Sequence, residues 1–151
     1  MNGELPGHVF SGLDGQSLDL KISATLSTQD PVSAIEIVKN GRVERAVPIA
    51  EWKNGGTLAT LTFVESGWFL VRAIADNPKT FRFASTAPYY VEIGKTKRRI
   101  SKASAQFFLD WVRERAQRVK LEDADQRREV LKPHERAERF WADVVSRANS
   151  Q

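Results

Sequence analysis

Alternating apolar and polar residues dominate the first half of the chain. From Ser17 to Leu26 every second residue is apolar, and the same period-2 pattern returns over residues 57–64. This pattern is typical of a strand that covers a core with one face. Turn signals recur roughly every 8–12 positions up to residue 94, which predicts about seven short strands.

The strongest turn signal is Asn40-Gly41, which separates the apolar alternation of residues 33–38 from that of residues 43–49. Asn and Gly both tolerate the positive φ angles of a type I′ turn, so the segment predicts a β-hairpin. Pro48 cannot donate a ladder hydrogen bond, which predicts that the returning strand is an edge or ends there.

Residues 67–93 hold the longest apolar run. Trp68–Ala75 is apolar on both faces except at Arg72, which predicts a central strand with Arg72 near a rim or paired. Asn77-Pro78 and Ala87-Pro88 mark turns. The aromatic residues around these turns are predicted to face the core: Trp68, Phe81, Phe83 and Tyr89.

The pattern changes to a helical period after Gly94. Ser101 is a good N-cap, and the helical pattern that follows puts one stripe of residues along about five turns (Phe107, Phe108, Trp111, Val112, Arg115, Val119). A short helix is expected to end at Leu131, and Pro133 suits the first turn of a final helix. That final helix carries its own stripe (Ala137, Phe140, Trp141, Val144, Val145, Ala148).

These elements predict an immunoglobulin-like antiparallel β-sandwich over residues 1–94. Residues 95–151 are expected to form a helical extension of two to three helices that packs on the sandwich through its stripes. Charge divides at the same place: residues 1–94 carry 8 Lys and Arg against 10 Asp and Glu, and residues 95–151 carry 15 against 9. No apolar stretch is long enough for a membrane helix, and the N-terminus has no signal-peptide pattern, so the compartment stays open.

Few residues suggest chemistry. The chain has no cysteine, and His8 and His134 lie outside any metal-ligand spacing, so no metal and no cofactor are expected. Phosphate-loop and nucleophile-elbow motifs are absent, and Asp76 and Glu92 have no spacing that marks an acid–base pair. No catalytic residue is assigned, and the chain alone is not expected to be an enzyme.

Binding is the remaining class of function. The basic run Lys95, Lys97, Arg98 and Arg99 has no interleaved aromatic residues, so nucleic-acid binding is disfavoured. Exposed aromatic rings on a sandwich can stack on sugars, and Trp52 and Tyr90 are the candidates. Arg72, the lone charge in its strand, completes the set of candidate ligand-binding residues.

Two segments resemble the β-sandwich region that follows the catalytic domain in CehA/McbA-type metallohydrolases, enzymes of the PHP (polymerase-and-histidinol-phosphatase) class. The first holds Ile35-Glu36-Ile37-Val38 and Asn40-Gly41; the second holds Trp68, Val71-Arg72-Ala73 and the run Thr86-Ala87-Pro88-Tyr89-Tyr90-Val91-Glu92. The resemblance covers roughly residues 7–94, and the helical tail is similar to an extension in some longer members.

The resemblance implies an accessory domain rather than an enzyme, because the H-x-H motifs that supply the metal ligands of a PHP domain are absent. It further implies that the chain is the C-terminal part of a larger protein, whose catalytic domain in cis is the expected partner. A secreted or periplasmic location of that larger protein is compatible with the resemblance. The alternative is a stand-alone sandwich that binds carbohydrate or another ligand.

Overall fold

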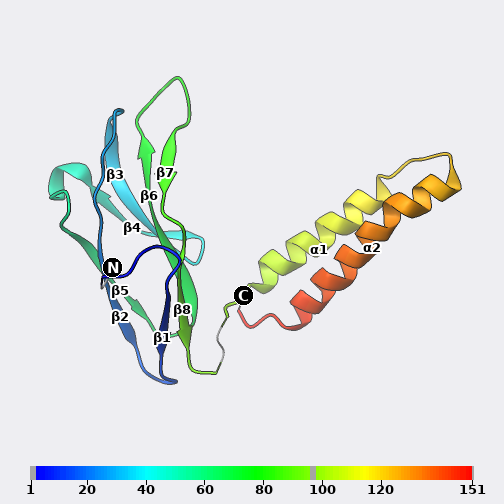
Figure 1. Cartoon of the computed structure of the whole chain (residues 1–151), viewed down its shortest axis with the longest axis horizontal. Helices are drawn as coiled ribbons and strands as arrows, with labels where there is room; N and C mark the ends of the chain where they lie inside the picture. The colour runs from blue at the N-terminus through cyan, green and yellow to red at the C-terminus, as the bar shows by residue number, and fades with distance from the viewer. Residues whose placement is uncertain (1–2, 96–97, 151) are drawn as a thin grey trace. The chain divides into compact units, whose positions relative to one another are not determined.

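The computed structural model describes residues 3–95 and 98–150. The chain forms two compact units, which divide between Arg98 and Arg99 (Figure 1). The domain bounds expected from the sequence, 1–94 and 95–151, and the packing of the helices on the sandwich stay predictions.

The first unit is an immunoglobulin-like β-sandwich, as the sequence predicts. One sheet has the order β1-β8-β6-β3-β4, with β7 also paired to β6, and the other consists of β2 and β5. A short 3₁₀ turn, η1 (Ile49–Glu51), follows β4. The strands are β1 (Val9–Gly12), β2 (Leu18–Ser23), β3 (Val32–Lys39), β4 (Arg42–Pro48), β5 (Thr57–Phe63), β6 (Gly67–Ala75), β7 (Phe83–Ser85) and β8 (Tyr89–Ile93).

Strand β1 departs from the sequence expectation in two ways. No strand was expected at Val9–Gly12, and β1 pairs with β8 in parallel, whereas the strands paired with β3, β5 and β6 run antiparallel. Four residues with one inward aromatic ring, Phe10, give little periodicity to detect.

Inward residues of both sheets form one core. Phe69 is fully buried and stacks on Tyr89, with ring centroids 5.0 Å apart and ring planes 7° apart. Phe63 from the opposite sheet approaches Phe69 at 5.8 Å. The aliphatic part of the core is Leu20, Ile22, Ile35, Ile37, Leu58, Ala59, Leu61, Val71, Val91 and Ile93.

The hairpin prediction at Asn40-Gly41 is confirmed. Asn40 has φ 50° and Gly41 φ 87°, both in the left-handed region. The Asn40 backbone N–H donates to the Trp68 carbonyl at 3.0 Å, and its side-chain Oδ1 accepts from the Trp68 N–H at 3.0 Å. The tip of the β3–β4 hairpin is therefore fastened to the start of β6. Pro48 ends β4, the edge strand, as predicted.

The prediction that Phe81 and Phe83 face the core is wrong, since 74% of Phe81 and 61% of Phe83 are exposed. The register explains the error for Phe83. It lies opposite Ile74 of β6, and residues directly opposite in an antiparallel pair share a face. Val71 and Ala73 are the buried residues of this part of β6, so Ile74 and Phe83 point outward.

The second unit is a pair of helices that pack against each other, α1 (Lys102–Gln117) and α2 (Ala124–Ser146). Ser101 is the N-cap of α1, as predicted, and accepts from the Ser104 N–H at 3.2 Å. Asp123 caps α2 in the same way, through Gln126. Neither helix is long and apolar enough to span a membrane, as far as the described residues go.

The expected break at Leu131–Pro133 is wrong, because α2 is continuous and contains Pro133 in its interior. A proline there removes the N–H that would bond the carbonyl of Glu129. Glu129 and Pro133 are both exposed, so water can serve that carbonyl instead. His134 Nδ1 lies 3.0 Å from the Val130 carbonyl at the same turn.

The ends of the helical unit are joined by hydrogen bonds. The Lys102 N–H donates to the Ser150 carbonyl at 2.7 Å, and the Asn149 N–H donates to the Ile100 carbonyl at 3.1 Å. Asn149 Oδ1 also accepts from the Ile100 N–H at 2.8 Å. The segment after α2 therefore lies beside the segment that leads into α1.

Candidate functional site

Trp52 follows η1 and is only partly exposed. Its ring packs against the core, and its Nε1 donates to the Gly56 carbonyl at 3.2 Å. The indole N–H thus holds the turn that leads to β5, and the ring packs on the core instead of standing free to stack on a sugar.

Arg72 lies on the outer face of β6, half-buried, with its Nε 2.5 Å from Glu36 Oε2. Glu36 is its direct cross-strand neighbour on β3. The prediction that Arg72 is paired is therefore confirmed. The ion pair offsets the charge of Arg72 with that of Glu36, so together they add no net charge to the outer face of the sheet.

Tyr90 lies on the outer face of β8 with 45% of its surface exposed. Trp68 of β6 is its direct cross-strand partner, and Val9 of β1 flanks it on the other side. Leu70 and Val38 extend this apolar row toward β4, where Val43 is 47% exposed. We call this row the outer-face row. It brings Tyr90 onto the same face as Arg72, whereas Trp52 packs elsewhere, against the core.

Trp68 was assigned to the core from the sequence, yet it lies partly exposed in the outer-face row. A sequence signal could have located it. Trp68, Leu70 and Arg72 have the same parity along β6, and a charged residue in a strand normally points toward solvent. The position of Arg72 therefore identifies the outward face.

The helical unit carries an aromatic cluster of five rings, Phe107, Phe108, Trp111, Phe140 and Trp141. Phe108 of α1 stacks on Trp141 of α2, with centroids 4.7 Å apart, and the other three rings contact one of these two. Phe107, Trp111 and Phe140 are 64%, 51% and 55% exposed. The buried residues of α1 are instead Ala105 and Leu109, so most of the predicted stripe faces outward.

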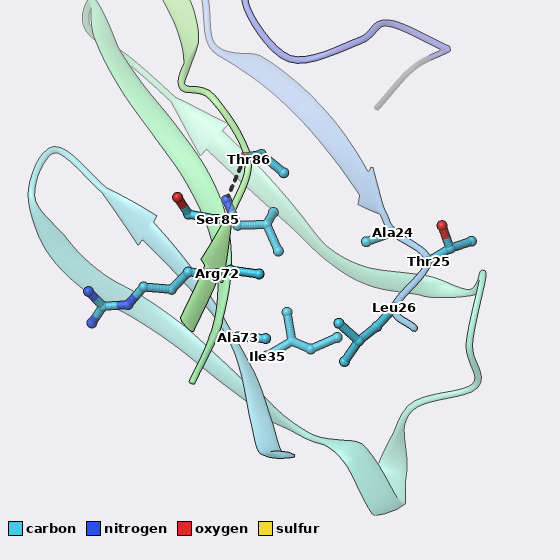
Figure 2. Close-up of a pocket in the computed structure, with 10 residues that line it drawn as sticks. Ala24, Thr25, Leu26, Ile35, Arg72, Ala73, Ser85 and Thr86 are labelled. Carbon is cyan, nitrogen blue, oxygen red and sulfur yellow. Dashed lines mark hydrogen bonds between the residues drawn. The ribbon is translucent and has the colours of Figure 1, made fainter. Parts of the chain in front are cut away.

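An open groove lies on the sandwich between the end of β2 and strand β7 (Figure 2). It has a volume of about 210 Å³ and is lined by Ala24–Leu26 on one side and Ala84–Thr86 on the other. Ile35, Val71 and Ala73 line its interior. Figure 2 shows the Arg72 guanidinium pointing away from it. The groove is apolar and bordered by backbone.

The ionisable groups offer little for catalysis. No group of three or more His, Asp or Glu side chains among residues 3–95 and 98–150 could hold a metal. Asp76 accepts from Ser33 Oγ at 2.6 Å, and His8 lies 3.2 Å from Glu4. Burial raises the pKa of the Tyr89 hydroxyl. Of the predicted basic run, Lys97 lies outside the described residues.

Comparison with known proteins adds one distant likeness. No family model matches the chain, and no curated protein does. Among solved structures, fibronectin(III)-like modules of Clostridium thermocellum CbhA are 22% identical, cover 60% of this chain and 90% of that chain, and superpose with a TM-score of 0.38. The overlap is loose, so the assignment of the sandwich depends on the strand order and the core described above.

Proposed function

We propose that the chain is a non-catalytic accessory module that binds a protein partner, and that the partner is a catalytic domain of PHP type in the same polypeptide. The aromatic cluster of the helical unit carries this proposal. Exposed apolar patches of this kind mark interaction sites. Trp and Arg are also the residues that contribute most to binding energy at protein interfaces.

The charges beside the cluster indicate the character of the partner. Arg115 lies one helical turn beyond Trp111 and forms no ion pair in the described part of the chain. Residues 99–151 carry 12 Lys and Arg against 9 Asp and Glu. A partner surface that combines apolar and acidic side chains would complement this unit.

The first test is the reading frame upstream of Met1. A region with H-x-H metal-ligand motifs in the same frame supports the proposal, and its absence contradicts the choice of partner. The second test titrates that catalytic domain with this chain, each purified separately, by calorimetry. Trp111→Ala with Phe140→Ala should weaken binding by about 10-fold or more.

Val64→Ala is the matched control for that titration. Val64 is 72% exposed but lies on the sandwich, outside the aromatic cluster, so its loss should leave the affinity unchanged. Equal affinity of the double variant and the control would exclude the cluster as the interface.

Carbohydrate binding is a second candidate, favoured by the pairing of Tyr90 and Trp68 on neighbouring strands of an exposed sheet face. Two rings side by side could stack on the apolar faces of sugar units. A glycan-array screen of the intact chain tests this. Tyr90→Ala should abolish the signal, whereas Trp52→Ala, whose ring packs on the core, should reduce it only through instability. No glycan above background would exclude this function.

A further inference from the structure

Strand β7 has one unpaired edge. The Ala75 N–H donates to the Arg82 carbonyl at 2.9 Å, and the Thr86 N–H donates to the Val71 carbonyl at 2.9 Å. Backbone groups alternate in direction along an antiparallel strand, so Arg82, Ala84 and Thr86 face β6. The backbone N–H and C=O groups of Phe83 and Ser85 therefore point to the open side, and no hydrogen bond occupies them within the described residues.

The opposite wall of the groove is also an unpaired edge. The Ala24 carbonyl accepts from the Gly55 N–H at 3.0 Å. Asn54 then binds both backbone groups of Leu26, each at 2.9 Å. Ala24 and Leu26 thus face the β5 side, and Thr25 between them turns its N–H and C=O away, without a partner in the part of the chain that the structure describes.

The position of β1 shows how the β7 edge could be completed. Both β7 and β8 pair with the same side of β6, at Arg72–Ile74 and at Gly67–Phe69. Strand β1 already covers the outer edge of β8, in parallel. The free edge of β7 therefore continues the row that β1 occupies, and a strand placed there would extend an edge pairing that the fold already uses.

The chemistry of the groove selects its occupant. Its interior side chains, Ile35, Val71 and Ala73, are buried and carry no charge. The nearest ionic groups are used in pairs, Arg72 with Glu36 and Arg82 with Asp30 at 2.9 Å. A groove with apolar walls and unpaired backbone groups along its border suits an extended peptide with uncharged inward side chains.

We propose that the free edge of β7 binds an extended polypeptide segment, which adds as a strand through the backbone of Phe83 and Ser85 and fills the groove between β7 and Ala24–Leu26. This site is separate from the aromatic cluster and stands independently of the function proposed above. Because the site would recognise mainly the backbone of the bound peptide, the peptide must be extended and carry small or aliphatic side chains toward the groove, but it need not have one particular sequence.

A phage-displayed library of random 12-residue peptides, panned against the intact chain, tests the proposal. Enriched peptides should protect the amides of Phe83, Ser85 and Thr25 from hydrogen exchange. Because this map is recorded on the unaltered chain, it does not depend on any variant folding. Failure to enrich peptides, or protection confined to other segments, would overturn the proposal.

A pair of variants at one position adds a sharp control. Ser85→Pro removes the outward N–H and spares the bonds to β6, and proline is tolerated at an edge. Binding of the selected peptides should fall about 10-fold or more, whereas Ser85→Ala, which keeps the N–H, should bind as the unaltered chain does. Equal binding by both variants would refute recognition through the backbone. Self-association of the chain that Ser85→Pro abolishes would instead make a second copy the occupant and overturn the proposal.

Discussion

Tyr89 lies in the middle of the sandwich core, 3% exposed, with its ring stacked on Phe69. Its hydroxyl reaches toward the Glu4 carbonyl at 3.4 Å, too far for a strong hydrogen bond. Burial therefore disfavours the phenolate and raises the pKa of Tyr89 above its ordinary value of 10.0.

The raised pKa gives a prediction on stability at alkaline pH. The folded chain holds the Tyr89 proton more tightly than the unfolded chain, so the free energy of unfolding should fall as pH rises through and beyond 10.0. Urea unfolding at increasing pH measures this. Tyr89→Phe should flatten the dependence of the unfolding free energy on pH; an unchanged slope in this variant would contradict the assignment.

Core and surface aromatic residues should differ sharply in their contribution to stability. Phe69→Ala leaves a cavity between the sheets and should lower the free energy of unfolding by about 3–5 kcal/mol. Phe81→Ala removes a ring that is 74% exposed and should change it by less than about 0.5 kcal/mol. Denaturant unfolding followed by tryptophan fluorescence compares the two; similar losses would mean that Phe81 is buried after all.

At the scale of elements, the β3–β4 hairpin depends on one side chain at its tip. Asn40 has a left-handed backbone and its Oδ1 accepts from the Trp68 N–H. Alanine adopts a left-handed backbone less readily than asparagine and cannot accept the hydrogen bond from the Trp68 N–H. We therefore expect Asn40→Ala to lower the free energy of unfolding by about 1–3 kcal/mol. Asn40→Asp keeps an acceptor and should retain most of it. Thermal unfolding of the two variants measures the difference. Equal melting temperatures would mean that the hydrogen bond from Trp68 of β6 to the Asn40 side chain does not stabilise the fold.

The interior proline of α2 leads to a prediction of opposite sign. Pro133→Ala restores the N–H for the Glu129 carbonyl and removes a steric clash, so the helical unit should gain about 1–3 kcal/mol. Circular dichroism at the helical band during urea unfolding measures the change. Glu135→Ala, at another exposed position of α2, is the control for altered surface charge and propensity. Destabilisation by Pro133→Ala would show that the helical unit requires proline at this position.

Local signals in the sequence were sufficient where one residue type decides the structure. The Asn40-Gly41 turn, the Ser101 cap and the end of β4 at Pro48 depend on backbone chemistry alone. Sequence could not place Phe83, because alternation identifies two faces without saying which one is covered. It also could not foresee that α2 continues through Pro133. The hydrogen bond that proline removes is offset because the Glu129 carbonyl is exposed to water and α2 packs along α1.

The candidate sites were less predictable than the fold. Tyr90 was found because it alternates with buried neighbours, and its partner Trp68 was missed although Arg72 shares its parity. The unpaired edge of β7 arises because β7 and β8 share one side of β6, while β1, distant in sequence, covers β8 alone. No local pattern reports which backbone groups are left unpaired once a sheet has formed.

At the scale of the whole molecule, the expectation that the helices pack on the sandwich leads to a truncation experiment. If the stripes around Phe108 and Trp141 cover the sandwich, instead of binding the separate partner proposed above, deletion of residues 101–151 should expose apolar surface and cause aggregation. Light scattering and thermal unfolding of residues 1–95 measure this. A monomeric fragment with an unchanged melting temperature would show that the sandwich does not need the helices.

The hydrogen bonds between Ile100–Lys102 and Asn149–Ser150 have a consequence for protein engineering. Because the helical unit begins and ends at one place, it has the geometry of an insertable domain. Residues 99–150 could be grafted into a surface loop of a host protein without separating the two flanks of that loop. The connection between α1 and α2 would then display a guest epitope at the far end of two helices.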